Sequence, residues 1–394
     1  MRSIKLLPTI AIAVILVIYI AVIIIVPAIV DKKYNTVTLL PPYQISARAQ
    51  KVYNQLPFIA DLHCDALLWK RNLLKSHDYG HVDVPRMIEA GMSLQAFTIV
   101  SKTPKNMNFD NNTGETDNIT SLFIAQGRPI KTWFSLKQRA LAQCKQLHNF
   151  AEKSQGNFRV ITSSSELSNY IIEKNKNNNI TAGFLGVEGM QVLEGEIENI
   201  DAMYHAGIRM MAPVHFFDNK LGGSAHGKSK DGLTDFGKKV IRQMEAKQMI
   251  VDLAHASPKL IDDVLKISTR PIIVSHTGVK GTCDNVRNLS DKHLKEIAKN
   301  GGLVGIAFFE PAVCGTSAAA TAKAIRYTVN LIGIDHVALG SDFDGAFKMH
   351  FDITGLPLLV DELLKLNFNE EEIMLIMGAN TKKFLLKNLP QSAS

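Results

Sequence analysis

The sequence is poor in cysteine and has no local cysteine pairs. Four cysteines occur in 394 residues, with no C-x-x-C pair among them: Cys64, Cys144, Cys283 and Cys314. This spacing argues against a thiolate zinc site and against a dense disulfide framework, and it leaves one isolated disulfide open. Fixed-period repeats and low-complexity tracts are also absent from the sequence. A single globular body is therefore the simplest interpretation.

Positive charge is present but is not concentrated. The net charge is +7 and the sequence pI is about 9.0, which would permit nucleic-acid binding. The basic residues are dispersed, however, and lysine-rich runs such as "EKNKNNN" are typical of solvated surface. We therefore expect no nucleic-acid partner.

The N-terminus holds a long apolar run, residues 9–30, without a charged side chain. At about 1.5 Å per helical residue, such a run can cross a bilayer core of about 30 Å. A cleavable signal has a shorter apolar region of about 7–15 residues and then a small-x-small site, so we favour a retained signal anchor over residues 1–30. A cleaved signal peptide and a buried core helix are the alternatives.

Flanking charges indicate the orientation of this segment. Arg2 and Lys5 precede it, whereas Asp31 partly offsets Lys32 and Lys33 after it. The positive-inside rule then predicts a single-pass membrane protein whose globular part is outside the cytoplasm, periplasmic or extracellular. Cleavage of the segment would instead yield a secreted protein.

A polar linker is expected over residues 31–56, followed by a body over residues 57–390. Eight short apolar runs alternate with amphipathic stretches in this body, and they begin at Phe58, Ser93, Ala182, Ile208, Met249, Pro271, Gly302 and His336. Near-continuous apolar runs suit parallel strands covered on both faces. The pattern predicts a (β/α)8 barrel, with a doubly wound open sheet as the rival.

Other segments add detail to this prediction. Helices are expected at 135–154, 235–248 and 290–300, where Ser290 can cap the first turn. The segment "FRVIT" from Phe158 suits a further strand, within an unusually long excursion over 101–181.

Polar residues at the strand ends distinguish the two folds, because the active site of a barrel gathers where its strands end. The first run ends in "DLHCD", and alternation along a strand directs His63 and Asp65 to one side and Cys64 to the other. Five further runs end on ligand-type side chains: Glu188, His215, His255, His276 and Asp342. One buried histidine is usually structural, but four at strand ends together with three carboxylates predict a metal site.

Imidazole and carboxylate ligands suit zinc, and one carboxylate can join two metals about 3.5–4 Å apart. A hydroxide held between two such ions is a nucleophile at neutral pH, because the cations depress the pKa of bound water. The other histidines, including His226, are interpreted as structural or surface groups.

In their order and spacing, these motifs resemble the membrane dipeptidase (renal dipeptidase) family of zinc peptidases, within the amidohydrolase-like hydrolases. The matching segments are "DLHCD", "GVEG", "PVHFFDN", "GLTDFG", "VDLAH", "SHTG", "NVRNLSD", "GSDFDG" and "MGANTKKFL", over roughly residues 57–387. The resemblance implies a (β/α)8 fold with two Zn2+ per chain. It also implies hydrolysis of dipeptides by a metal-bridging hydroxide.

The resemblance further implies a role for each matching residue. His63 and Asp65 would hold one zinc, His255 and His276 the other, and Glu188 would bridge them. His215 would contact substrate and stabilise the oxyanion, Arg287 would bind the substrate carboxylate, and Asp342 would contact substrate and act as the acid/base group. Asp344 competes with Asp342 for that last role.

Alternatives remain at the level of function. The ligand set alone also suits lactone, cyclic-amide or phosphoester hydrolysis, and a membrane-anchored binding protein with a degenerate barrel is a further hypothesis. The expected partners are dipeptides and, through the N-terminal helix, a membrane; a homodimer is one oligomeric state that the sequence permits.

Overall fold

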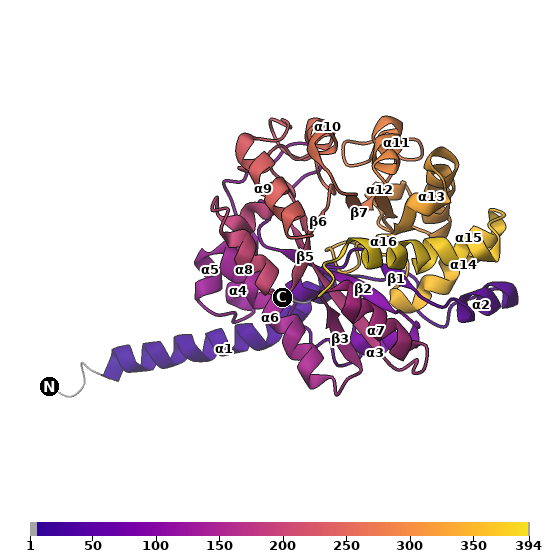
Figure 1. The fold of residues 1–394 in the computed structure, drawn as a ribbon. Coiled ribbons are helices and arrows are strands. Elements are labelled where there is room, and N and C mark those ends of the chain that lie inside the picture. Colours follow the sequence, from indigo (N-terminus) through magenta and orange to yellow (C-terminus); the bar gives the residue numbers. More distant parts are fainter. Residues whose placement is uncertain (1–5, 393–394) are drawn as a thin grey trace.

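The computed structural model describes residues 6–392, and a parallel sheet of eight strands lies at its centre (Figure 1). The strand order is β6-β5-β4-β2-β1-β9-β8-β7. A parallel bridge between Asp252 and Ile273 joins β6 to β7, so the ring nearly closes. This is the predicted (β/α)8 barrel, and the open doubly wound sheet is excluded.

Each of the eight apolar runs contains one barrel strand. The barrel strands are β1 (Ala60–Asp61), β2 (Leu94–Val100), β4 (Thr181–Glu188), β5 (Ile208–Ala212), β6 (Ile250–Val251), β7 (Ile273–Thr277), β8 (Leu303–Ile306) and β9 (Val337–Leu339). The further strand expected near Phe158 is β3 (Phe158–Ile161), which pairs with β4 off the path of the ring.

Helices surround the sheet and connect its strands. They are α1 (Leu6–Tyr34), α2 (Ala47–Asn54), α3 (Val84–Glu89), α4 (Ile119–Ala125), α5 (Lys131–Phe134), α6 (Leu136–Lys153), α7 (Ser164–Lys174), α8 (Asn199–His205), α9 (Asp235–Ala246), α10 (Pro258–Ile267), α11 (Asp291–Lys299), α12 (Glu310–Val313), α13 (Ala318–Ile332), α14 (Leu356–Lys365), α15 (Glu370–Met374) and α16 (Asn380–Asn388). The three expected helices are α6, α9 and α11. Ser290 caps α11 as predicted, because its hydroxyl accepts a hydrogen bond from the backbone N–H of His293.

Alternation along the strands divides the core into an inner and an outer part. Ala182 and Phe184 of β4 belong to a cluster that also contains Leu385 of α16. Glu188 is in the same alternating row of β4, at the carboxyl end of the strand. The row that fills the barrel therefore presents a carboxylate at its mouth.

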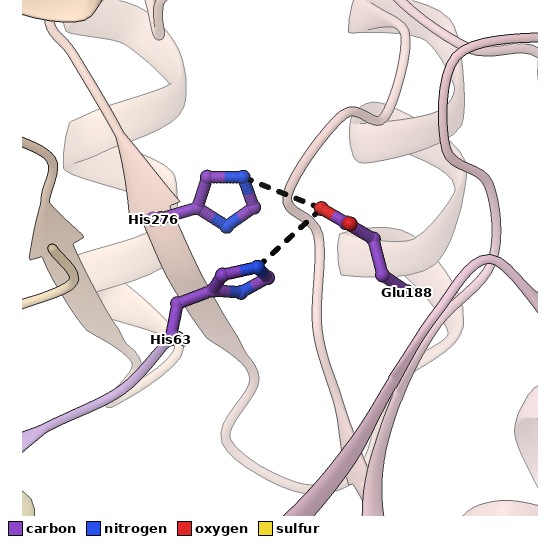
Figure 2. Close-up of side chains that lie close together, drawn as sticks. All are labelled: His63, Glu188 and His276. Carbon is purple, nitrogen blue, oxygen red and sulfur yellow. Dashed lines mark ion pairs between the residues drawn. The ribbon is translucent and has the colours of Figure 1, made fainter. Parts of the chain in front are cut away.

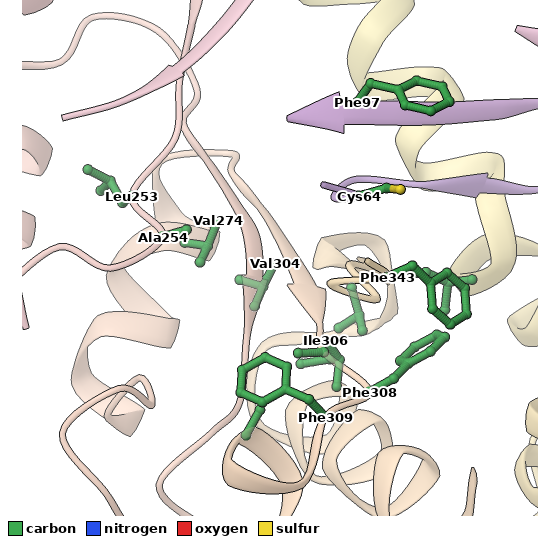
Figure 3. Packing of buried hydrophobic residues seen from close by; sticks show 14 of the residues in the cluster. Cys64, Phe97, Leu253, Ala254, Val274, Val304, Ile306, Phe308, Phe309 and Phe343 are labelled. Atoms are coloured by element: carbon green, nitrogen blue, oxygen red, sulfur yellow. The ribbon is translucent and has the colours of Figure 1, made fainter. Parts of the chain in front are cut away.

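The outer part of the core packs the strands against the helices, as Figure 3 shows for Val304, Ile306, Phe308 and Phe343. Cys64 lies in this outer cluster and is fully buried. Its neighbours His63 and Asp65 approach each other at the site, with 3.5 Å between Nε2 and Oδ1. The predicted alternation of the "DLHCD" segment is confirmed. Burial in the apolar cluster makes this thiol a packing group.

The N-terminal helix α1 projects from the body in Figure 1. Within the described residues, Pro8–Tyr34 is long and apolar enough to cross a membrane, a property that it would share with a signal sequence. The segment 31–56, expected to be a linker, contains the end of α1 and helix α2. Part of it packs on the barrel, because Val37 forms a parallel bridge with Met349.

Candidate metal centre

Glu188 lies at the centre of the cluster of polar side chains at the barrel mouth. Figure 2 shows the imidazoles of His63 and His276 directed at its carboxylate. His63 Nε2 is 3.6 Å and His276 Nε2 is 3.4 Å from Glu188 Oε1. These residues come from the ends of β1, β4 and β7, far apart in the sequence and together in the fold.

Two more imidazoles contact the same carboxylate. His255 Nε2 lies 2.8 Å from Glu188 Oε1, and His215 Nε2 lies 3.1 Å from Glu188 Oε2. His255 and His276 are also neighbours, with 3.0 Å between their Nε2 atoms. One carboxylate thus touches all four of the histidines that the sequence placed at strand ends.

The remaining two carboxylates gather around His63. Its Nε2 atom is 3.5 Å from Asp65 Oδ1 and 3.8 Å from Asp342 Oδ1. The potential ligand atoms form three overlapping groups, namely His63 with Glu188 and His276, Glu188 with His215 and His255, and His63 with Asp65 and Asp342. The predicted residues therefore converge on one site, and each of the three groups could hold a metal ion.

Irregular backbone turns several of these side chains toward the site. The register of β7 against β8 shifts by one residue between Val274 and Thr277, so that β7 carries a bulge there. A bulge interrupts strict alternation, and consecutive residues Ser275 and His276 both approach His63. His255 and Asp342 have φ of 62° and 63°, in the left-handed region that non-glycine residues adopt mainly at turns and functional sites.

Two hydroxyl groups that the sequence analysis missed orient the potential ligands. Ser275 Oγ lies 3.1 Å from Nδ1 of both His63 and His276, which leaves the Nε2 atoms directed at the site. Thr98 Oγ1 donates a hydrogen bond to Asp65 Oδ1 at 2.7 Å. Such outer contacts fix ring orientation and basicity. Alternation along β2 would have predicted that Thr98 faces the site, whereas the bulge in β7 prevents such a prediction for Ser275.

His226 is a buried neighbour of the site, so it is not a surface group. Its ring stacks on Phe216 at 4.6 Å and lies 5.1 Å from the ring of His255. Nδ1 is 2.7 Å from the carbonyl oxygen of Phe109. Burial lowers the pKa of His226 to about 3, so this imidazole is neutral.

Burial lowers the pKa of His255 and His276 well below the usual value, which favours the neutral imidazoles that bind metals. At His63 burial also acts to lower the pKa, but the charges of Glu188 and Asp65 outweigh it and raise the pKa to about 10. Burial, with the charge of Asp65, raises the pKa of Glu188 well above its usual value. Burial likewise raises the pKa of Asp342 to about 8. His63 opposes this rise, whereas the charge of Asp65 adds to it. A cation is the natural compensation for carboxylates that are crowded in this way.

Arg287 is held close to this cluster by a cross-linked loop. Its side chain is buried, and Nη2 donates a hydrogen bond to the carbonyl oxygen of His276 at 2.8 Å. A disulfide joins Cys283, in the loop of Arg287, to Cys314 at the end of α12. The isolated disulfide that the sequence left open is therefore present, and it ties the arginine loop to the neighbouring strand-to-helix connection.

The two aspartates of the last strand end have different surroundings. Asp342 lines the cavity at the barrel mouth, together with Asp65, Glu188 and Arg287. Asp344 is fully buried and pairs with Arg71 Nη2 at 2.6 Å, and it accepts a hydrogen bond from the backbone N–H of His81. Asp344 is therefore engaged in a buried ion pair, whereas Asp342 faces the cavity.

The cavity measures about 540 Å³, within the range of sites for small molecules. A parallel barrel with a carboxylate-linked imidazole cluster at its C-terminal mouth defines a metal-dependent hydrolase. Residues 46–389 match the family model described as membrane dipeptidase, peptidase family M19. The chain belongs to this family and is a metallodipeptidase.

The chain is also similar to individual proteins and solved structures. "Dipeptidase tcpJ" of Claviceps purpurea is 27% identical over 316 residues, which cover 78% of this chain and 69% of that protein. A Klebsiella pneumoniae protein described as "Uncharacterized protein in pqqA 5'region" is 30% identical over 253 residues, 60% of this chain and 91% of that protein. The crystal structure of a Rhodobacter sphaeroides metallo peptidase, liganded with a phosphinate mimic of the dipeptide L-Ala-D-Ala, superposes with a TM-score of 0.70 at 23% identity, covering 84% of this chain and 99% of that chain.

Proposed function

We propose that this metallodipeptidase uses two zinc ions. His63 and Asp65 would hold one ion, His255 and His276 the other, and Glu188 both. The observation that carries the proposal is the central position of Glu188, whose Oε1 atom lies within 3.6 Å of the Nε2 atoms of three imidazoles, those of His63, His255 and His276. One carboxylate between two sets of nitrogen donors is the arrangement that a bridging ligand requires.

The donor set fits zinc. Among the residues that the structure describes, His63 Nε2 has no hydrogen-bond partner although it is buried between carboxylates. Neutral imidazoles and carboxylates are zinc ligands, and the Ser275 and Thr98 contacts supply the outer support that such ligands usually have. When bound, the two ions would supply Lewis acidity toward the scissile carbonyl and would lower the pKa of a water molecule.

The residues around the ligands would perform the proton chemistry. Asp342 faces the cavity and is placed to accept the proton of the attacking water and to return it to the leaving amine. His215 also lines the cavity, and burial lowers its pKa well below the usual value. A neutral imidazole carries one N–H, which His215 would direct at the oxygen that becomes negative in the transition state.

Arg287 would bind the carboxylate of the dipeptide, because a guanidinium matches that group in shape and charge. We expect Arg287→Ala to raise KM for free-acid dipeptides about 10- to 100-fold, since hydrogen bonds to charged groups contribute about 1.5–3 kcal/mol. Kinetics with free-acid and C-terminally amidated dipeptides would check this, with Arg287→Lys as the charge-conserving control. Unchanged discrimination between acid and amide in Arg287→Ala would remove this role.

We also propose that α1 is a retained anchor and that the barrel lies outside the cytoplasm. Arg2 and Lys5 precede the apolar run, as the positive-inside rule requires for this orientation. The Cys283–Cys314 disulfide supports the same side, because disulfides persist in oxidising compartments. The phosphinate dipeptide mimic bound to the Rhodobacter sphaeroides peptidase supports a short peptide as the substrate.

One experiment tests the centre and the substrate together. The full-length protein, purified in detergent, is expected to contain two zinc ions per chain by elemental analysis. It is expected to hydrolyse dipeptides and to leave a lactone and a phosphotriester intact. Protein that contains no zinc, or that hydrolyses the lactone in preference to dipeptides, would contradict the proposal.

A further inference from the structure

The C-terminal half of α1 packs along the catalytic body through one face. Most of its buried and half-buried positions recur at spacings of three and four residues: Tyr19, Val22, Ile23, Val26, Pro27, Val30 and Asp31; Ala28 is also half-buried. This spacing places them on one side of a helix. Residues 8–18, by contrast, are exposed throughout, in the part of α1 that projects from the body in Figure 1.

Polar contacts of the helix fasten it to the body along this face. Tyr19 Oη donates to the carbonyl oxygen of Ile124 at 3.2 Å, and Lys70 Nζ donates to that of Ile23 at 3.2 Å. The helix also approaches Gly127 closely, because a Cβ atom at this glycine would lie 3.0 Å from Ile23 Cδ1. Attachment therefore extends over about four helical turns.

A buried ion-pair chain connects the end of α1 to the last strand of the barrel. Asp31 Oδ2 lies 2.8 Å from Arg71 Nε, and Arg71 Nη2 lies 2.6 Å from Asp344 Oδ1. The three side chains are nearly inaccessible to solvent. Without α1, the buried guanidinium would face one carboxylate in place of two, so the barrel is built to hold this helix.

The same helix lines the cavity that contains the metal centre. Val26 and Val30 of α1 contribute to its wall, as do Glu188 and Asp342. The lining includes the apolar side chains of Val26, Val30, Leu68, Trp69, Ile119 and Leu122, and also the polar side chains of Lys33, Asn118 and Ser121. The apolar side chains form a wall that favours contact with a hydrophobic group.

We propose that α1 is a specificity-determining part of the enzyme, and that Val26 and Val30 form the wall against which a bulky apolar side chain of the dipeptide packs. The inference rests on the proposed function, because it assigns a subsite within the same cavity. It adds that the docked helix is required for substrate selection. Residues 8–18, together with the exposed face formed by Ile20, Ile24, Ile25 and Ile29, are the part of α1 that is left to contact a membrane. Dipeptides with a leucine-sized side chain are the substrate class that fits this wall.

The test uses the full-length protein with three substrates, Gly-Gly, Leu-Gly and Gly-Leu. Val30→Trp places an indole ring in the space beside this wall, where the leucine side chain would pack. We therefore expect kcat/KM for at least one leucine-containing dipeptide to fall tenfold or more relative to Gly-Gly. The matched control is Ile29→Trp, because Ile29 is 58% exposed and does not line the cavity. In this control the ratios among the three substrates should stay as in the unmodified protein.

The outcomes separate the subsite from the function. Suppose that the unmodified protein hydrolyses the dipeptides. If Val30→Trp then leaves the ratios of kcat/KM among the three substrates unchanged, or if Ile29→Trp changes these ratios equally, the proposed subsite is refuted and the proposed dipeptidase function is not. If the unmodified protein hydrolyses none of them, the proposed function fails and the subsite fails with it. Should Val30→Trp not fold, Val30→Ala serves instead, and it is expected to shift preference from leucine- toward phenylalanine-containing dipeptides; an unshifted preference would refute the wall.

Discussion

Glu188→Gln is expected to remove dipeptidase activity and to lower the zinc content of the purified protein together. Glutamine keeps the size of the side chain, but its neutral amide lacks the negative charge with which a carboxylate bridges two cations. We expect kcat/KM to fall at least about 1,000-fold, which corresponds to about 4 kcal/mol at 1.36 kcal/mol per tenfold change. Elemental analysis and dipeptide kinetics on the same preparation measure both effects.

The control for this change is Glu196→Gln, the same substitution at an exposed position eight residues later. It should retain zinc and full activity. Two zinc ions retained in Glu188→Gln would contradict the bridging role, even if activity were lost. Thermal unfolding of both variants should be compared with and without added zinc, because the zinc-dependent gain in stability should be smaller for Glu188→Gln.

Asp342→Asn is expected to lower kcat about 100- to 10,000-fold, the usual contribution of a positioned general acid or base. The amide cannot accept the proton of the attacking water, whereas the residues proposed to hold zinc remain. Zinc content should therefore stay near that of the unmodified protein. Stopped assays for kcat, together with elemental analysis, distinguish a proton-transfer role from a role in metal binding.

Asp344→Asn provides the structural contrast two residues later. Its carboxylate is paired with Arg71 in the interior, and breaking a buried pair costs about 3–5 kcal/mol of folding free energy. This variant should unfold at lower temperature, whereas Asp342→Asn should not. If the two variants lost the same stability and the same kcat, the division of roles between these aspartates would be wrong.

The sequence alone predicted the strand ends and their chemistry. Apolar runs are local, and a side chain that follows such a run must lie at the carboxyl end of its strand. In a parallel barrel all these ends meet at one rim, so His63, Glu188 and His255 were expected together although they are far apart in the chain. Alternation also placed Cys64 correctly, because its burial in the outer cluster follows from period two.

Tertiary structure alone decided what depends on irregular backbone and on long-range packing. The bulge in β7 turns Ser275 and His276 to the same site, which no periodic pattern predicts. The pairing of Cys283 with Cys314 likewise depends on two loops that meet only in the folded chain.

The N-terminal helix shows the same division. Its composition predicts a membrane-spanning or signal segment, because hydrophobicity and length are properties of the local sequence. Its contact with the cavity, and the buried pair of Asp31 with Arg71, exist only where α1 docks on the barrel. Local sequence determines which elements form, whereas the contacts between distant elements are determined only when the whole chain packs.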